Sequence, residues 1–280
     1  PAMRVVMGYR FAGRLGEVRG SVIDVRAIAD ALVVLTGQGS ELKLEWWDHS
    51  GTPLRTRTLD ALGGRVVSAM AAAPDGQLLL LTSEGPVLLH ADGSLRARWR
   101  NVELPTPDVV WLSPERIVAA LPQAGGLVEL DAEGHPVAVL RQLAGAPTSL
   151  WNPISVARSP DGQTWALVQL DGRLLLFTTS AGIETARFVR EISLPLLSPG
   201  VWPRSLTFHG AEQLLVAEPE RMRILMYAVD GHRLLSREPE NDWHRLLAEI
   251  GDVRRIVPFG RDVVVLGSAP WLARFQPAEP

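Results

Sequence analysis

The sequence predicts an all-β fold built from repeated antiparallel units, and three observations lead to this prediction. A short glycine-containing turn recurs at intervals of 41 to 49 residues, at Gly51, Gly93, Gly134, Gly182 and Gly231. Between these turns lie copies of a second hairpin, in which two apolar runs flank a polar turn. The last unit is one strand short, whereas the N-terminus has a strand to spare. A period of about 40–50 residues with several short strands per unit is typical of propeller blades.

The second hairpin supplies the two inner strands of each unit. Its clearest copy is ISVARSPDGQTWALV at Ile154–Val168, and others lie at Met70–Leu81 and Val110–Leu121. Proline and glycine suit its turn because proline presets φ and glycine tolerates positive φ. A third apolar strand and a fourth, more polar strand follow each copy, so each unit forms a four-stranded blade. The inner turns centre near Asp30, Asp75, Pro114, Asp161, Gly210 and Arg261.

The two ends of the chain predict how the ring closes. The sixth unit stops after Trp271–Pro277, and Val5–Leu15 forms a strand-like segment ahead of the first inner hairpin. If this segment supplies the outermost strand of blade six, two open sheet edges disappear at once. We therefore predict a six-bladed β-propeller, a single domain over residues 1–280. Pro1 and Ala2 ahead of Met3 are typical of a cloning scar.

One insertion breaks the repeat between blades five and six. Asn241 is a suitable helix cap and Gly251 a suitable stop. The apolar residues between them have the spacing of a single helical stripe, Trp243, Leu246, Leu247 and Ile250. This predicts a short amphipathic helix at Asp242–Ile250. Its stripe either packs onto the propeller or is displayed to a partner.

Composition limits the classes of function. The net charge is −3 and lysine occurs once, at Lys43. Such a balance argues against nucleic acid or an anionic membrane as partner, and arginine in place of lysine favours a GC-rich, bacterial genome. With no cysteine, disulfides and zinc–thiolate sites are excluded. No apolar run reaches the roughly 18 residues of a membrane span. We expect a cytoplasmic protein, although a removed signal peptide stays open.

One stretch carries a resemblance to known repeats. NPISVARSPDGQTWALVQLDGRLLLFTT at Asn152–Thr179 resembles the NHL and YVTN-like propeller repeats, and Val66–Ala91 and Trp202–Asp230 resemble them in part. As architecture the chain is also WD40-like. The resemblance implies a platform that binds proteins or RNA. Similar six-bladed folds also include metal-dependent lactonases, so the resemblance alone implies both a binding module and an enzyme.

A binding surface is predicted where the connectors between blades meet the channel mouth. Tryptophan and arginine are the residues most enriched at interface hot spots, and both gather in connectors over blades four to six. The alternatives are that each tryptophan covers its own blade and that the arginines are solvated or pair with Asp252. The candidate binding residues are Trp151, Trp202, Arg204, Trp243, Arg254 and Arg255.

The lactonase resemblance implies a different site, a divalent cation held in the channel by a glutamate, two asparagines and an aspartate. This chain has three asparagines in all, and only Asn152 begins an inner strand. Asn152, Asp108 and Asp252 are therefore the candidate ligands for Ca²⁺ or Mg²⁺, with Asp24 as a further neighbour. Alternatively, these carboxylates bond to nearby backbone N–H groups.

No motif of a catalytic zinc, a nucleophile elbow or a phosphate loop is present. We therefore expect a noncatalytic scaffold with no cofactor that binds another protein or a peptide through its channel mouth. The alternative is a lactonase- or hydrolase-like enzyme with a cation in the channel. The pair Trp46-Trp47 is expected to fill the core, because neighbouring strand residues face opposite sides of a sheet.

Overall fold

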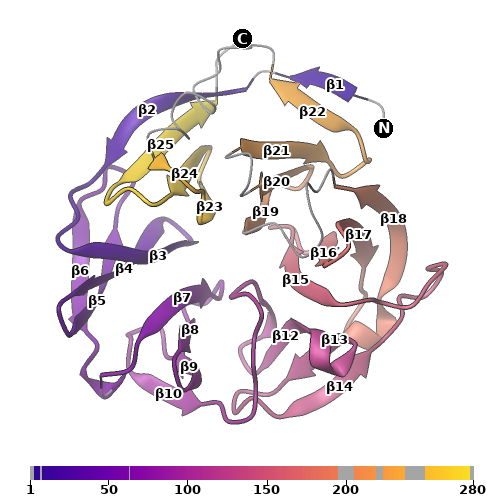
Figure 1. The fold of residues 1–280 in the computed structure, drawn as a ribbon, viewed down its shortest axis with the longest axis horizontal. Helices are drawn as coiled ribbons and strands as arrows, with labels where there is room; N and C mark the ends of the chain where they lie inside the picture. The colour runs from indigo at the N-terminus through magenta and orange to yellow at the C-terminus, as the bar shows by residue number, and fades with distance from the viewer. Residues whose placement is uncertain are drawn as a thin grey trace.

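In a computed structural model, which describes residues 3–6, 8–62, 64–194, 205–218, 223–236 and 250–277, six antiparallel sheets stand in a ring around a central channel (Figure 1). The six-bladed propeller is thus confirmed. Each blade has four strands, which lie side by side in order from the channel to the rim, and blade five has one further strand at the rim. Within the described residues, no helix is long or apolar enough to cross a membrane.

The strands of the first three blades follow chain order from the channel outward. Blade one consists of β3 (Ser21–Ile28), β4 (Ala31–Gln38), β5 (Glu41–Trp47) and β6 (Pro53–Thr58). Blade two consists of β7 (Val67–Ala72), β8 (Leu78–Thr82), β9 (Gly85–Leu89) and β10 (Leu95–Arg98). Blade three consists of β11 (Val110–Ser113), β12 (Arg116–Leu121), β13 (Gly126–Leu130) and β14 (Pro136–Leu140).

Blades four and five continue this order, whereas blade six takes its outer strand from the N-terminus. Blade four consists of β15 (Pro153–Arg158), β16 (Trp165–Gln169), β17 (Arg173–Thr178) and β18 (Arg187–Ser193). Blade five consists of β19 (Ser205–His209), β20 (Gln213–Glu218), β21 (Arg223–Ala228) and β22 (Arg233–Ser236). Blade six consists of β23 (Arg255–Phe259), β24 (Asp262–Leu266), β25 (Leu272–Pro277) and β2 (Tyr9–Leu15). Short 3-10 turns lie at Asp60–Leu62, Pro122–Ala124 and Ile183–Thr185.

The turns follow the predicted chemistry with one exception. Gly51, Gly93, Gly134 and Gly231 have φ between 82° and 94°, the left-handed region that favours glycine in a bulged hairpin turn. In the same turn, Gly134 N–H donates to the carbonyl of Asp131 at 3.0 Å. Gly182 differs, with φ of −82° at the start of the 3-10 turn between β17 and β18. That connection is longer than a tight hairpin, so it needs no left-handed residue.

The N-terminal segment closes the ring, but it is two strands rather than one. β2 pairs antiparallel with β25 of blade six, as predicted. β1 (Met3–Val6) instead pairs in parallel with β22 of blade five. The predicted single strand Val5–Leu15 was therefore wrong at its start. The chain passes from one blade to the next near Gly8, and together β1 and β2 span the seam between blades five and six.

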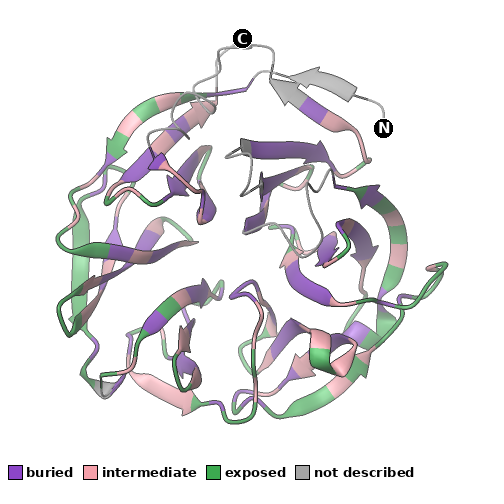
Figure 2. Cartoon of the chain, viewed as in Figure 1, coloured by how far each residue is buried: buried purple, intermediate pink, exposed green. Residues whose placement is uncertain are grey.

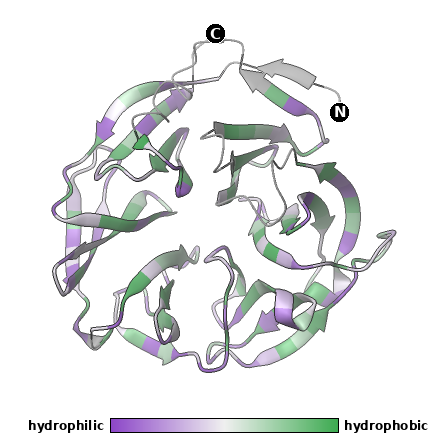
Figure 3. Cartoon of the chain, viewed as in Figure 1, coloured by the Kyte–Doolittle hydropathy of each residue, from purple (hydrophilic) through white to green (hydrophobic). Residues whose placement is uncertain are grey.

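The core consists of apolar layers between neighbouring blades. Within the described residues each of the six seams has its own cluster of buried side chains. Inner strands are largely buried and apolar, whereas outer strands are exposed and mixed (Figures 2 and 3). Trp46 packs in the seam between blades one and two, and Trp47 in the seam between blades six and one. The expectation that both rings fill the core on opposite faces is confirmed.

Side-chain hydrogen bonds also join three pairs of neighbouring blades near the rim. Arg57 on β6 donates to the carbonyl of Asp92 at 2.9 Å, and Trp99 Nε1 donates to the carbonyl of Ala132 at 2.8 Å. Arg190 on β18 donates to the carbonyl of Asp230. In each case a residue on or directly after an outer strand bonds to the outer turn of the following blade. Such bonds fix the blades against one another, and Trp99 also belongs to the buried cluster between blades two and three.

Candidate functional site

The connectors between blades and the turns between second and third strands share one face, which we call the mouth face. Ser83, in the turn between β8 and β9, donates its backbone N–H to the carbonyl of Val66 in the preceding connector at 2.8 Å. In blade four, Leu170 N–H donates in the same way to the carbonyl of Asn152 at 3.0 Å. These bonds give the mouth face a fixed shape although it consists of loops.

Trp151 lies on this face, in the connector between β14 and β15, and is 49% exposed. Its backbone N–H donates to Gln169 Oε1 at 2.6 Å. Gln169 is fully buried at the end of β16, so its hydrogen bond attaches the connector to the interior of blade four. The next residue, Asn152, has φ of +41°, a left-handed conformation that asparagine tolerates better than most residues. The backbone is therefore held in place while about half of the surface of Trp151 is exposed.

The predicted neighbours of Trp151 divide into two groups. Trp202, Arg204 and Trp243 lie outside the described residues, so their places on the mouth face stay predictions, and the predicted helix at 242–250 likewise falls outside them except for Ile250. Arg254 is half-buried, and its Nη2 donates to the carbonyl of Ile23 at 2.9 Å. Arg255 is only 4% exposed. The structure therefore brings neither arginine together with Trp151 as a solvated rim.

Arg255 instead belongs to a buried ion-pair network across the channel. Its Nε and Nη2 donate to the two oxygens of Asp24 at 3.0 and 3.1 Å, and its Nη1 donates to Asp108 Oδ1 at 3.1 Å. Arg26 Nη2 donates to the same Asp108 oxygen at 3.0 Å, and Asp108 Oδ2 accepts from Ser155 Oγ at 3.0 Å. Blades six, one, three and four are thus joined across the centre of the ring.

Asp24 is the most completely bonded group of this network. Besides Arg255 it accepts from the backbone N–H groups of Val25 and Met70, each at 2.8 Å. Burial by itself would raise the pKa of the Asp24 carboxyl, but the charges of Arg255 and Arg26 together with these hydrogen bonds hold it below the usual value. For Arg255, burial opposes the charged form, yet Asp24 and Asp108 raise the pKa above its ordinary value. Both groups are therefore ionised inside the ring.

The network bears on the candidate cation site. Both oxygens of Asp108 already accept hydrogen bonds, two of them from guanidinium groups. Within the described part of the chain, the one cluster of three or more acidic or histidine ligands is Asp131, Glu133 and His135 in the hairpin between β13 and β14. It includes neither Asp108 nor Asp252. A cation bound at Asp108 would have to displace two arginines that are also positively charged, so the residues present do not fit Ca²⁺ or Mg²⁺ there.

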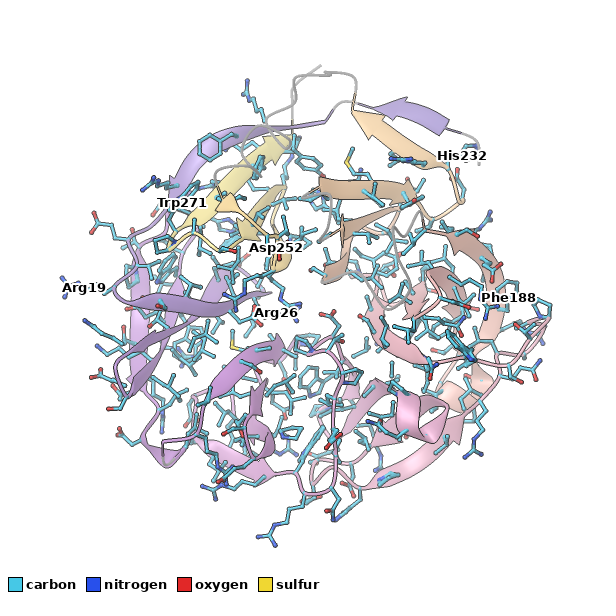
Figure 4. All side chains as sticks on the ribbon, viewed as in Figure 1. Arg19, Arg26, Phe188, His232, Asp252 and Trp271 are labelled. Atoms are coloured by element: carbon cyan, nitrogen blue, oxygen red, sulfur yellow. The ribbon has the colours of Figure 1, made fainter. Side chains whose placement is uncertain are left out.

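Sequence reasoning placed Asp24 and Asp108 at the channel but missed their partners. Arg26 and Asp108 are 82 residues apart, and Arg255 and Asp24 are 231 apart. One signal was available, because Asp24 and Arg26 are two apart on an inner strand and so point to the same side. Figure 4 shows Arg26 reaching from β3 toward the centre of the ring.

Comparison with known proteins supports the fold. The chain is similar to the WD40 β-propeller domain of Doa1, with a TM-score of 0.61, 13% identity, and coverage of 98% of this chain and 99% of that one. It is similar to the β-propeller domain of Cps50 (Swd1) from Myceliophteria thermophila, with a TM-score of 0.61, 10% identity, and coverage of 97% and 100%. No family model and no curated protein sequence matches. The WD40-like architecture is therefore supported, whereas the NHL or YVTN repeat type stays a prediction.

Proposed function

We propose that this chain is a noncatalytic scaffold, one domain over residues 1–280, that binds another protein or a peptide through its mouth face. The observation that carries the proposal is the indole of Trp151, which is 49% exposed on a connector held by a buried glutamine. A large aromatic on a rigid backbone loses little conformational entropy on binding, which is why tryptophan is enriched at hot spots. The likeness to other propellers supports the rigid platform.

A second apolar side chain on the same face supports this choice. Val66, in the connector between β6 and β7, is 71% exposed. Beside it lies a polar cleft of about 610 Å³ between the turn of β8 and β9 and the connector that leaves blade two. A partner that crosses the mouth could therefore use Trp151 as one anchor and place a polar side chain in this cleft.

A binding comparison tests the proposal. Wild-type protein and Trp151→Ala would be immobilised and exposed to lysate of the source organism, and the affinity of any retained protein would then be measured. Truncating a central tryptophan anchor costs about 2–4 kcal/mol, which is a loss of affinity of about 30-fold or more. Equal retention by the variant would refute the assignment of this site.

Val189→Ala is the matched control. Val189 is 48% exposed but lies on β18 at the rim, so its truncation removes apolar surface away from the mouth face. Both variants should unfold at the temperature of the wild type, because neither side chain belongs to a seam cluster. If Val189→Ala lost the partner and Trp151→Ala kept it, the binding surface would be the rim.

A further inference from the structure

The channel contains a cavity on the side of the network that faces away from the mouth. It holds about 480 Å³ and is lined by residues of all six inner strands, a volume within the ordinary range of small-molecule sites. Pro74 and residues 160–162 of the inner turns also line it, so it opens toward the face that carries those turns. Arg26 and Asp108 lie at its inner end, where the network closes the channel.

About half of the lining surface is apolar. The apolar residues of this lining that keep part of their surface exposed include four from different blades, Ala27, Ala72, Ala157 and Pro258. This half of the lining favours apolar groups, because burial of apolar surface contributes about 25 cal/mol per Å². The cavity therefore suits a ligand with a hydrocarbon portion.

Arg26 supplies the charge at the inner end. Its Nε donates to the carbonyl of Met70 at 2.7 Å and its Nη2 to Asp108 at 3.0 Å. These bonds orient the guanidinium, and its remaining nitrogen, Nη1, has no hydrogen-bond partner among the described residues. The side chain keeps 17% of its surface exposed, against 5% for Asp108. An oriented N–H donor thus faces the cavity, whereas both oxygens of Asp108 are already bonded.

The balance of charge points the same way. Burial and the neighbouring charge of Arg255 lower the pKa of Arg26 despite the attraction of Asp108 and Asp24. Arg26 is therefore the cation of the network with the least compensation, and an additional anion would stabilise it. At the outer end, Arg158 and Asp161 carry opposite charges, so neither sign is excluded from entering.

We propose that this cavity binds an amphipathic monocarboxylate, with its carboxylate on Arg26 and its hydrocarbon portion along the apolar half of the lining. Carboxylates and guanidinium groups form charge-assisted hydrogen bonds of defined geometry. This site is separate from the mouth face, because the ion-pair network lies between the two. Its ligand and the scaffold partner would therefore bind independently.

Octanoate is the probe for calorimetric titration at pH 7, with octan-1-ol and acetate as matched controls. The alcohol keeps the hydrocarbon and loses the charge, and acetate keeps the charge and loses the hydrocarbon. We expect saturable binding of octanoate and at least about tenfold weaker binding of both controls. No binding of octanoate, or equal binding of acetate, would overturn the proposal.

Variants locate the site. Arg26→Met keeps the aliphatic stem and should weaken octanoate at least about tenfold, whereas Arg254→Met makes the same chemical change outside the cavity and should leave binding unchanged. Because Arg26→Met also disturbs the network, Ala157→Leu serves as a second test, since it narrows the cavity and keeps every charge. Trp151→Ala should bind octanoate like the wild type. Unchanged affinity in folded Arg26→Met or in Ala157→Leu would contradict the assignment.

Discussion

Replacing Arg255 with methionine would test whether the ion-pair network holds the ring together. The change removes two hydrogen bonds to Asp24 and one to Asp108, and it leaves Asp24, which is 2% exposed, with Arg26 as its remaining cation. Removing one partner of a buried ion pair costs about 3–5 kcal/mol. Since domains are stable by about 5–15 kcal/mol, we expect a large fall in the free energy of unfolding, measured with urea at pH 7.

The dependence on pH gives this test its sharpest form. In the wild type the pKa of Asp24 is lowered, so its contribution is complete above the unfolded value of about 3.9 and is lost as the pH falls through the lowered pKa. In Arg255→Met burial dominates and the pKa of Asp24 moves up. A raised pKa gives a penalty at neutral pH that disappears on acidification. The stability gap between variant and wild type should therefore narrow from pH 7 to pH 4.

Arg254→Met is the control, because Arg254 bonds only to backbone carbonyls among the described residues. Arg254→Met should lower the free energy of unfolding by about 1 kcal/mol, and its difference from the wild type should not become smaller as the pH falls. The reasoning would be refuted if Arg255→Met cost less than about 1 kcal/mol, or if its gap to the wild type stayed constant down to pH 4.

Three further predictions concern the seam, the turns and the channel. Tyr9→Phe removes a hydroxyl that bonds across the seam to Gln213, and should lower the free energy of unfolding by about 1 kcal/mol; no loss would mean that the bond contributes nothing. Gly134→Ala places a Cβ 2.6 Å from the ring of Trp99, whereas Gly39→Ala, also at positive φ, meets nothing within 4 Å. Both variants should lose about 1–2 kcal/mol of the free energy of unfolding to backbone strain, and Gly134→Ala should lose more because of the clash with Trp99. Equal melting temperatures for the two variants would argue against the clash. Ca²⁺ or Mg²⁺ should leave the melting temperature unchanged; a rise abolished in Asn152→Ala would instead support the lactonase alternative.

The features that the sequence predicted are either local or follow from the number of strands in each repeat. Turns such as Pro160–Gly162 require only a proline and a glycine at fixed spacing, and the missing outer strand of blade six follows from counting strands. The parallel pairing of β1 with β22 has no such signal, because residues 3–6 and 233–236 are joined only in the folded ring. The buried ion pairs of Arg255 have no local signal either, because the sequence around this residue is typical of a polar connector.

The candidate site shows the same division. Trp151 was a candidate for an exposed anchor because it lies beside a proline in a connector between blades, although the alternative that it covers its own blade was left open. Burial of Arg255 was not, since an arginine is buried only where carboxylates compensate its charge, and Asp24 and Asp108 lie on other blades. Tertiary pairing therefore decides whether an arginine near the channel is a surface group or part of the interior.

The seam between blades five and six is stabilised differently from the others. The charged network joins blades six, one, three and four, and the backbone of Met70 brings in blade two. Among the residues of blade five that the structure describes, the contact made there is a neutral one, in which Ser205 Oγ accepts from Ile256 N–H at 3.2 Å. At the rim, however, the N-terminal strands cover this seam, with β1 on blade five and β2 on blade six. Tyr9 at the start of β2 also reaches blade five, where it bonds to His209 and Gln213. Because a ring is only as stable as its weakest seam, strands β1 and β2 provide at the rim the connection between blades five and six that the charged network does not provide at the centre.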